Sequence, residues 1–188
     1  GYGPIKILIW SQMHGNESTC TKALFDFLLG LYKMGYESIL RLCSIYVIPI
    51  LNPDGAKIYS RLNANGVDLN RDAKTLSQKE SKVLTKVFSE FKPHYCFNMH
   101  DQRSIYSVGD TKFPSTISFL APSQDKKRSL SSNRERAMTI INHINKNIQP
   151  FIPKQVSRFD DTFNINCVGD KFQSLGVTTI LFEAGHQN

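Results

Sequence analysis

Short, almost continuous apolar runs along the chain alternate with longer stretches in which apolar residues recur at helical spacing. Residues 5–10, 44–50, 94–99, 116–120 and 177–182 form the apolar runs, which are typical of buried strands. Residues 18–33, 80–91 and 134–148 carry apolar stripes, which predict amphipathic helices. Strands and helices therefore alternate, and we expect an α/β fold with its ligand-binding groups at the carboxyl ends of the strands.

The composition is that of one soluble globular domain. The 188 residues are 40% hydrophobic and 21% charged. No apolar run approaches the roughly 20 residues that a membrane-spanning helix needs, and the first residues lack the regions of a signal peptide. Cys20, Cys43, Cys96 and Cys167 are widely spaced among apolar or small neighbours, which predicts reduced thiols. These features argue against a membrane span and favour a cytoplasmic location.

The chain is basic, with a formal net charge of +7. Its dense basic cluster, Lys126-Lys127-Arg128, lies in a polar stretch without the interleaved aromatic residues of many nucleic-acid-binding surfaces. We therefore interpret this cluster as solvated surface and expect no nucleic-acid partner.

A histidine and a carboxylate follow the first apolar run. His14 and Glu17 stand three residues apart where a strand gives way to a helix, so both side chains can turn toward one zinc ion. With five histidines and this content of acids, such a pair arises by chance about 0.4 times per chain. The pair alone therefore decides little.

Polar groups also follow three further predicted strands, at Asn52 to Gly55, at His100 and at Glu183. Strand ends of an open α/β sheet meet at one edge, so we expect these groups to lie near His14 and Glu17. A catalytic zinc commonly has three protein ligands and one water, and His100 is the natural third ligand. The weaker rivals are His94, within a strand, His143, within a helix, and His186.

Taken together, these motifs resemble one family. They are His14-Gly15-Asn16-Glu17, Asn52-Pro53-Asp54-Gly55, Arg61, the segment from Asn63 to Arg71, His100 and Phe182-Glu183. These motifs follow one another in the order found in the zinc metallocarboxypeptidases, the carboxypeptidase A-like family M14, which the chain therefore resembles. The resemblance implies a three-layer α/β fold with a mixed, mostly parallel central sheet and helices on both faces. It also implies a single catalytic domain over residues 1–188, with truncation at both ends left open.

The resemblance implies a ligand set and a general base. By similarity, His14, Glu17 and His100 hold one zinc ion per chain, and Glu183 is the general base that then becomes the proton donor. Zinc lowers the pKa of its water to about 7, where a neighbouring carboxylate can accept the proton.

Two arginines gain roles from the same resemblance. Asn70 and Arg71 would hold the C-terminal carboxylate of a peptide, and Arg61 would stabilise the tetrahedral intermediate. A guanidinium suits both tasks, because it presents paired donors to a carboxylate or an oxyanion. The implied substrate is a peptide or peptide-like molecule with a free C-terminal carboxylate.

The Asn52 to Gly55 motif and Asp101 have structural interpretations. Asn52-Pro53-Asp54-Gly55 favours a turn that shapes the floor of the site, and Asp54 could orient His14 through a hydrogen bond. Asp101, next to His100, could act in the same way or face solvent.

The chain departs from the family in two respects. The family's substrate-closing tyrosine lies some twenty residues before the catalytic glutamate, where this chain offers Phe159, Phe163 and Asn164 instead. The chain is also shorter than the usual domain. Without that tyrosine as an anchor, Val168 and Asp170 remain alternatives for the residue that sets side-chain specificity; an acid would favour basic termini and a valine apolar ones.

Two other functions stay open. A related zinc deacylase of N-acyl amino acids, similar to aspartoacylase and succinylglutamate desuccinylase, shares part of the motif set, although Asn52-Pro53-Asp54-Gly55 favours the peptidase branch. A non-catalytic module that binds peptide termini is the other alternative. A peptidoglycan stem peptide is a further candidate substrate of the peptidase.

Overall fold

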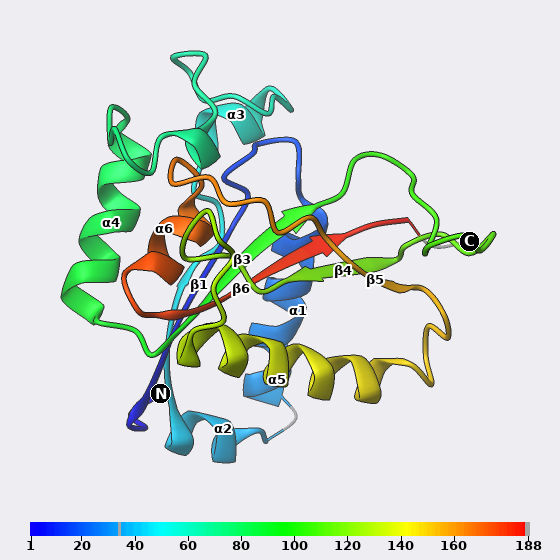
Figure 1. Ribbon diagram of the computed structural model, residues 1–188. Coiled ribbons are helices and arrows are strands. Elements are labelled where there is room, and N and C mark those ends of the chain that lie inside the picture. The colour runs from blue at the N-terminus through cyan, green and yellow to red at the C-terminus, as the bar shows by residue number, and fades with distance from the viewer. Residues whose placement is uncertain (34, 187–188) are drawn as a thin grey trace.

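One six-stranded sheet organises the protein, which is described by a computed structural model over residues 1–33 and 35–186 (Figure 1). The strand order is β2-β1-β3-β6-β4-β5. Strands β2, β1, β3 and β6 run parallel, whereas β4 is antiparallel to β6 and parallel to β5. The bounds are β1 (Ile5–Ser11), β2 (Cys43–Ile48), β3 (Tyr95–Asp101), β4 (Ile117–Leu120), β5 (Val156–Arg158) and β6 (Thr178–Ala184). The predicted mixed, mostly parallel sheet is confirmed.

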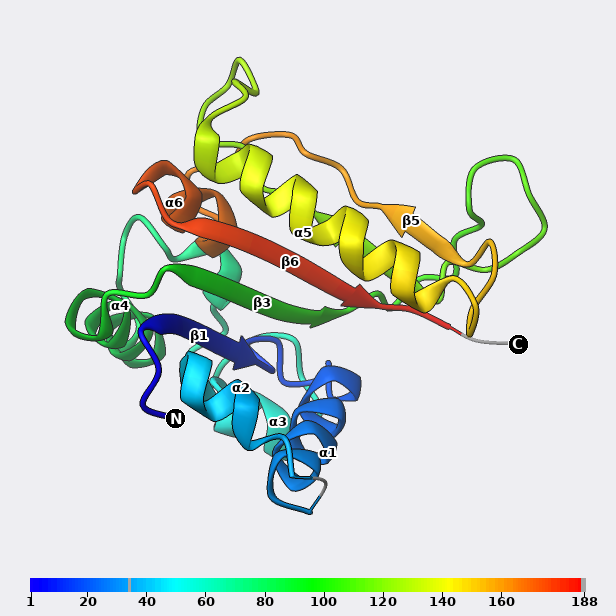
Figure 2. The same cartoon turned by 90° about the horizontal axis from the view of Figure 1, so that it is seen from below.

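Helices cover both faces of this sheet (Figure 2). Leu8, Trp10 and Cys96 of β1 and β3 pack against α4 (Lys79–Phe91) and α6 (Val168–Ser174). Side chains alternate between the faces along a strand, so Phe97 and Ile180 turn the other way and pack with α5 (Ser132–Ile148). Burial of apolar surface on both faces explains why the central strands read as continuous apolar runs. The remaining helical elements are α1 (Thr19–Lys33), α2 (Glu37–Leu42), α3 (Pro53–Lys57) and the 3-10 turn η1 (Leu69–Arg71).

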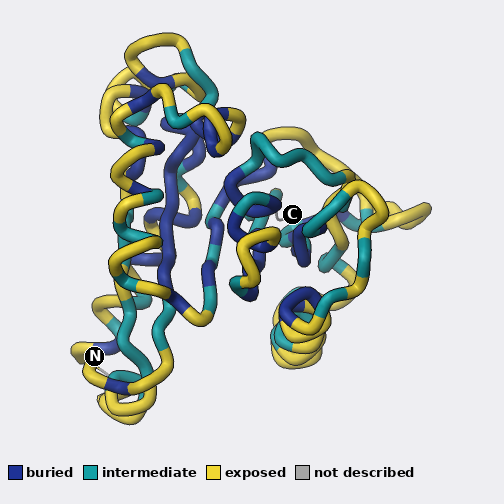
Figure 3. Tube along the Cα trace, turned by 60° about the vertical axis from the view of Figure 1, so that its left-hand side comes forward, coloured by how far each residue is buried: buried dark blue, intermediate teal, exposed yellow. Residues whose placement is uncertain are grey.

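Burial extends to the carboxyl ends of β1 and β3, within the buried centre of the molecule (Figure 3). The last four residues of β1 are buried, and so are the last two of β3, His100 and Asp101. Polar side chains that follow these strands therefore enter an environment from which water is largely excluded. In such surroundings polar groups need partners, which makes the site at this edge ordered.

The predicted strands and helices occur with their ends shifted by at most two residues. Five elements were not predicted: α2, α3, η1, β5 and α6. Each is short, at seven residues or fewer, so too few turns or pleats exist to show a periodic pattern. The predicted turn at Asn52 to Gly55 is a helical turn, because Asn52 caps α3 by accepting a hydrogen bond from the Gly55 N–H at 2.9 Å.

None of the described helices has both the length and the apolar character required to cross a membrane. The four cysteines are all free thiols in the structure.

Candidate metal site and catalytic cleft

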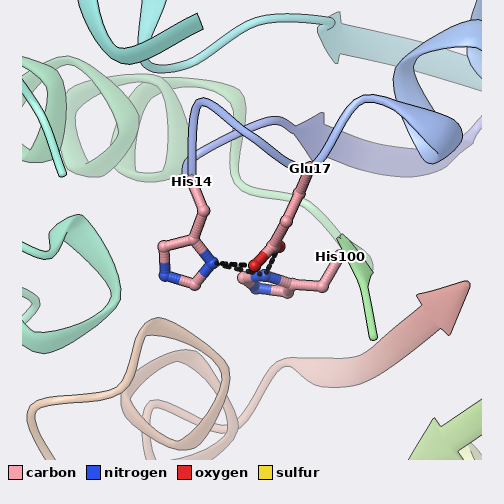
Figure 4. Close-up of side chains that lie close together, drawn as sticks. All are labelled: His14, Glu17 and His100. Atoms are coloured by element: carbon pink, nitrogen blue, oxygen red, sulfur yellow. Dashed lines mark hydrogen bonds and ion pairs between the residues drawn. The ribbon is translucent and has the colours of Figure 1, made fainter. Parts of the chain in front are cut away.

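His14, Glu17 and His100 converge at the carboxyl end of the sheet (Figure 4). Glu17 Oε1 lies 2.7 Å from His14 Nδ1, and its Oε2 lies 2.8 Å from His100 Nδ1. The side chains are at most 3% exposed. His14 and Glu17 come from the loop after β1, and His100 from the end of β3, as the strand-end argument expected.

The spacing of these atoms suits a zinc ion. Two nitrogen ligands at about 2.0–2.1 Å in tetrahedral geometry lie about 3.3 Å apart. The Nδ1 atoms of His14 and His100 are separated by 3.2 Å. Two imidazoles and one carboxylate also form the donor set of a catalytic zinc with an open position. The residues therefore fit the metal, and their role as its ligands remains a prediction.

Asp68 orients His14. Its Oδ1 lies 3.0 Å from His14 Nε2, on the opposite side of the ring from Glu17. A carboxylate in this place favours the tautomer with a proton on Nε2 and leaves Nδ1 free to bind a metal. The expectation for Asp54 was wrong: Asp54 is exposed at the start of α3, and Asp68 takes the orienting position because it precedes η1 and accepts the Asn70 N–H.

Asp101 neither orients His100 nor faces solvent. Its carboxylate accepts the backbone N–H groups of Thr19, at 2.7 Å, and Cys20, at 3.2 Å, at the first turn of α1. A carboxylate here also complements the positive end of the helix dipole. The backbone N–H of Asp101 donates to Glu17 Oε2 at 3.2 Å. Asp101 thus ties the end of β3 to the segment that carries Glu17.

Burial and hydrogen bonding act against each other on the pKa values of the triad, and the outcome differs between its residues. Burial disfavours the ionised form of Glu17, but hydrogen bonds with His100 and His14 outweigh it and hold the pKa of this carboxyl well below its usual range. Burial likewise opposes protonation of His14, and the bonds to Asp68 and Glu17 outweigh it, so the His14 pKa is raised. For His100, burial prevails and lowers the pKa.

Arg61 pairs with the same carboxylates. Its Nη1 lies 3.2 Å from Glu17 Oε1, and its Nε donates to Asp68 Oδ2 at 3.1 Å. The Arg61 side chain is 43% exposed and lines the same cleft as the triad. This places a positive charge next to the carboxylate of Glu17, at the edge of the triad.

Glu183 lines the same cleft. It lies in β6 at the register position opposite His100 of β3. Burial, and then the negative charge of Glu17, raise the pKa of Glu183 to about 8. A carboxyl in such surroundings holds a proton more readily than an exposed one.

The cleft has a volume of about 430 Å³, and Asn70 and Arg71 form part of its wall. Asn70 Oδ1 accepts the backbone N–H of Val168 at 3.1 Å, at the start of α6. Arg71 Nη1 lies 3.0 Å from the Asn70 carbonyl oxygen and 3.1 Å from Cys167 Sγ. These contacts fix both residues against α6 and leave them at the edge of the cleft.

The structure separates two sets of alternatives that the sequence left open. Of the three residues that the sequence offers in place of the tyrosine, Phe159 and Asn164 line the cleft, whereas Phe163 is not part of its wall. Val168 packs in the core with α4, whereas Asp170 lines the cleft. Asp170 is therefore the residue of that pair which a substrate can meet.

Sequence reasoning missed two polar residues of this region. Asp68 was quoted as part of a motif without a role of its own. Asn98 is fully buried in β3 and lines the cleft two residues before His100. An amide inside an otherwise apolar strand was the signal that could have indicated it. The rival histidines His94, His143 and His186 lie outside the triad.

Residues 3–105 match the sequence model of the Peptidase_M14 family, described as zinc carboxypeptidase. This range is more than half of the chain and contains all three residues of the triad. The chain therefore belongs to the zinc carboxypeptidase family.

Individual relatives agree with the family. Carboxypeptidase 2 of Trichophyton rubrum is 30% identical over 111 residues, which cover 57% of this chain and 21% of that protein. Carboxypeptidase A of Helicoverpa armigera has a TM-score of 0.73 and 17% identity, covering 98% of this chain and 53% of that chain. Murein-tripeptide amidase MpaA of Escherichia coli O157 has a TM-score of 0.54 and 16% identity. The match covers 99% of this chain and 76% of that chain. The structural matches show a shared fold, and the chain spans about a fifth of the length of the curated relatives it matches.

Proposed function

We propose that the protein is a zinc-dependent carboxypeptidase that hydrolyses the C-terminal amide bond of peptides. One observation carries the proposal: a buried His14–Glu17–His100 triad with zinc-like spacing opens into the same cleft as Glu183 and Arg71. The alternative of a non-catalytic module has less support, because the groups for water activation and for charge stabilisation are all present in that cleft.

One zinc ion, held by the triad, would lower the pKa of a water molecule and polarise the scissile carbonyl. Glu183 takes a proton from the attacking water and returns it to the nitrogen of the leaving amino acid, so that the carboxylate is regenerated in each turnover. Its position on β6, in register with His100, supports this role because it places the carboxylate beside the triad.

Arg61 and Arg71 interact with two different negative charges of the substrate. Arg61 lies against Glu17 and faces the oxygen that becomes negative during attack, so it stabilises the transition state. Arg71 and Asn70 bind the terminal carboxylate of the substrate, which restricts cleavage to chain ends. The substrate is then a peptide or peptide-like molecule with a free C-terminus.

A substrate panel tests the proposal. The zinc-loaded protein is incubated with N-blocked dipeptides and with N-acetyl and N-succinyl amino acids, and the free amino acid is quantified. Peptide turnover is expected, with Glu183→Gln lowering kcat by about 10²- to 10⁴-fold at unchanged zinc content. Turnover of the N-acyl amino acids alone would assign the protein to the deacylases. Tight peptide binding without turnover of any substrate would identify a binding module.

A further inference from the structure

A guanidinium that the proposed mechanism does not use lines the same cleft. Arg103 lies three residues after His100, beyond the end of β3, and forms part of the cleft wall. Its Nη1 donates to the Asn16 carbonyl oxygen at 2.7 Å and to the Tyr59 hydroxyl at 2.6 Å. The guanidinium carbon also lies over the Tyr59 ring, 5.1 Å from its centre. The cation is thus held on one side by a carbonyl oxygen and an aromatic ring.

The remaining donors of this guanidinium are free. Within residues 1–33 and 35–186, Nε and Nη2 of Arg103 have no hydrogen-bond partner, and the side chain forms no ion pair. Nε and Nη2 form one edge of the planar guanidinium, and such an edge suits the two oxygens of a carboxylate. An arginine that is fixed on one edge and unpaired on the other, at a cleft wall, points to an anionic ligand.

Tyr59 holds the guanidinium from a strained position. Its φ of 54° lies in the left-handed region, which a bulky residue rarely adopts. The residue is 60% exposed, so it is not kept in this conformation by packing into the core. Strained backbone of this kind tends to lie at ligand-binding and catalytic sites. We therefore interpret Tyr59 as a support for the cation of Arg103.

The backbone that carries Arg103 is anchored to the sheet. The Gln102 N–H donates to the Ala184 carbonyl oxygen of β6 at 2.6 Å, and Gln102 Nε2 donates to the Ser104 carbonyl oxygen at 3.0 Å. Gln102 itself is 8% exposed. These bonds limit the freedom that ligand binding would otherwise have to remove. The guanidinium is thus preorganised at the cleft wall.

Different walls of the cleft hold Arg103 and Arg71. Arg71 contacts Cys167, which precedes α6, whereas Arg103 contacts the loop after β1 and the segment after α3. A peptide with its terminal carboxylate at Arg71 and its scissile carbonyl at the triad therefore extends toward the remaining wall, where Arg103 lies. Three residues of backbone separate Arg103 from His100 and span at most about 11 Å. The long arginine side chain can reach the residue that precedes the cleaved bond.

We propose that Arg103 is a specificity-determining residue that binds a carboxylate on the residue directly before the cleaved bond. The edge formed by Nε and Nη2 receives the two carboxylate oxygens, while Tyr59 holds the opposite edge. This carboxylate is either the side chain of an acidic residue in ordinary α-linkage or the free α-carboxylate of a γ-linked glutamyl residue. The inference rests on the proposed carboxypeptidase function, since it identifies a substrate class of the same cleft.

Matched peptides test the selection. All are acetylated dipeptides that end in alanine and are compared by kcat/KM. One pair has glutamate or glutamine before the alanine, in α-linkage. The other has a γ-linked glutamyl residue with either a free α-carboxylate or its α-amide. The acid is expected to exceed its amide by about 10-fold or more in at least one linkage, which identifies the source of the carboxylate.

Substitutions test the assignment to Arg103. Arg103→Gln is expected to lower kcat/KM for the preferred acidic peptide by about 10-fold and to leave its amide within about twofold. Arg103→Lys keeps the charge without the planar edge and should retain part of the preference. Tyr59→Leu should lower the acid-to-amide ratio by about 2- to 5-fold. Arg41→Gln, which removes an exposed charge from α2, is the matched control and should keep the ratio.

The same measurements can overturn the inference. Equal turnover of acid and amide in both linkages by the wild-type protein contradicts an anion site. So does an equal loss for acid and amide in Arg103→Gln, which is the result expected if Arg103 only ties two loops together. If Arg103→Gln fails to fold, Tyr59→Leu decides the matter, and an unchanged ratio in that variant contradicts the inference. Zinc content and circular dichroism report folding.

A binding measurement separates this inference from the proposed function. Calorimetry of zinc-loaded Glu183→Gln with the four peptides measures affinity without turnover. Tighter binding of an acid than of its amide, abolished by adding Arg103→Gln, supports the anion site even if the wild-type protein hydrolyses no peptide, and that second result removes the proposed function. Peptide hydrolysis without a preference for the acid in either linkage supports the function and removes the anion site.

Discussion

Gly15 and Gly55 pass so close to each other that a Cβ on Gly15 would lie 2.0 Å from the Gly55 carbonyl carbon and 2.3 Å from Ala56 N. The loop that carries His14 and Glu17 is thereby seated on α3. Asn52 adds to the contact, because its Nδ2 donates to the Met13 carbonyl oxygen at 3.2 Å. Two motifs that are forty residues apart in the sequence therefore form one support for the candidate metal site.

Gly15→Ala is expected to destabilise the protein by about 1–3 kcal/mol and to weaken zinc binding, because the added methyl group meets backbone that cannot move aside. Gly30→Ala is the matched control. Its Cβ would meet only Tyr36 Cε2, at 3.9 Å, and alanine in a helix is favoured over glycine by about 0.5–1 kcal/mol. Urea unfolding measures both variants, and equal stability of the two would contradict the seating of this loop.

Asp68→Asn is expected to lower zinc affinity by about 10- to 100-fold, because His14 loses the carboxylate that sets its tautomer. Asp54→Asn provides the control, since Asp54 is exposed and is not among the described hydrogen-bond partners of His14. Competition with a chromophoric chelator gives the two affinities. A loss in the Asp54 variant that matches the loss in the Asp68 variant would show that charge alone matters.

Arg61 and Arg71 are expected to differ in the kinetic constant that their removal changes. Arg61→Ala should lower kcat by about 10²- to 10³-fold, because a group that faces the developing oxyanion acts in the transition state. Arg71→Ala should mainly raise KM, because a bond to the terminal carboxylate is present in both the ground and transition states. Full kinetics on one dipeptide distinguish these effects. The same KM increase in both variants would refute the division of roles.

Asp170→Asn is expected to stabilise the protein above pH 6. The raised pKa of about 6 means that the folded protein holds this proton more tightly than the unfolded chain, whose carboxyl titrates near 4. The wild-type protein therefore loses stability as the pH rises from about 4 to 6, by an amount that we place at about 1–2 kcal/mol after allowing for solvent screening. The asparagine variant lacks this loss.

Urea unfolding of wild-type protein and Asp170→Asn at pH 3.5 and pH 8 checks this expectation. The two proteins should be similarly stable at the lower pH, where the carboxyl is protonated, and should diverge at the higher. A constant difference across the range would contradict the linkage. Asp160→Asn, at the exposed rim, should show no such divergence.

The central strands and the convergence of the triad followed from the sequence because both depend on simple periodic patterns. Apolar runs predicted β1, β3 and β6, and parallel strands place their carboxyl ends at one edge. His14, His100 and Glu183 could therefore be grouped without coordinates. The partner of His14 could not be predicted in this way, because Asp68 reaches it from a polar loop whose path no pattern in the sequence determines.

The sequence could not predict which of Val168 and Asp170 faces the cleft. Val168 and Asp170 are two residues apart, and a shift in where a seven-residue helix begins decides which of them faces the cleft. Helix α6 lacks a side-chain cap at its start, so the sequence had no signal for that position. The contact of Asn70 with the Val168 N–H sets the orientation instead, and it joins residues 98 positions apart.

The position of β6 in the sheet has a consequence for the order in which the site is assembled. β6 pairs with β3 on one side and β4 on the other, although it comes last of the six strands in the sequence. A growing chain that has reached residue 105 already contains His14, Glu17 and His100, whereas Glu183 is made almost eighty residues later. Long-range strand pairing forms slowly, because a large loop must close first. A chain synthesised to residue 105 thus contains all three residues of the triad before Glu183 is made, and Glu183 reaches the triad only when β6 pairs between β3 and β4.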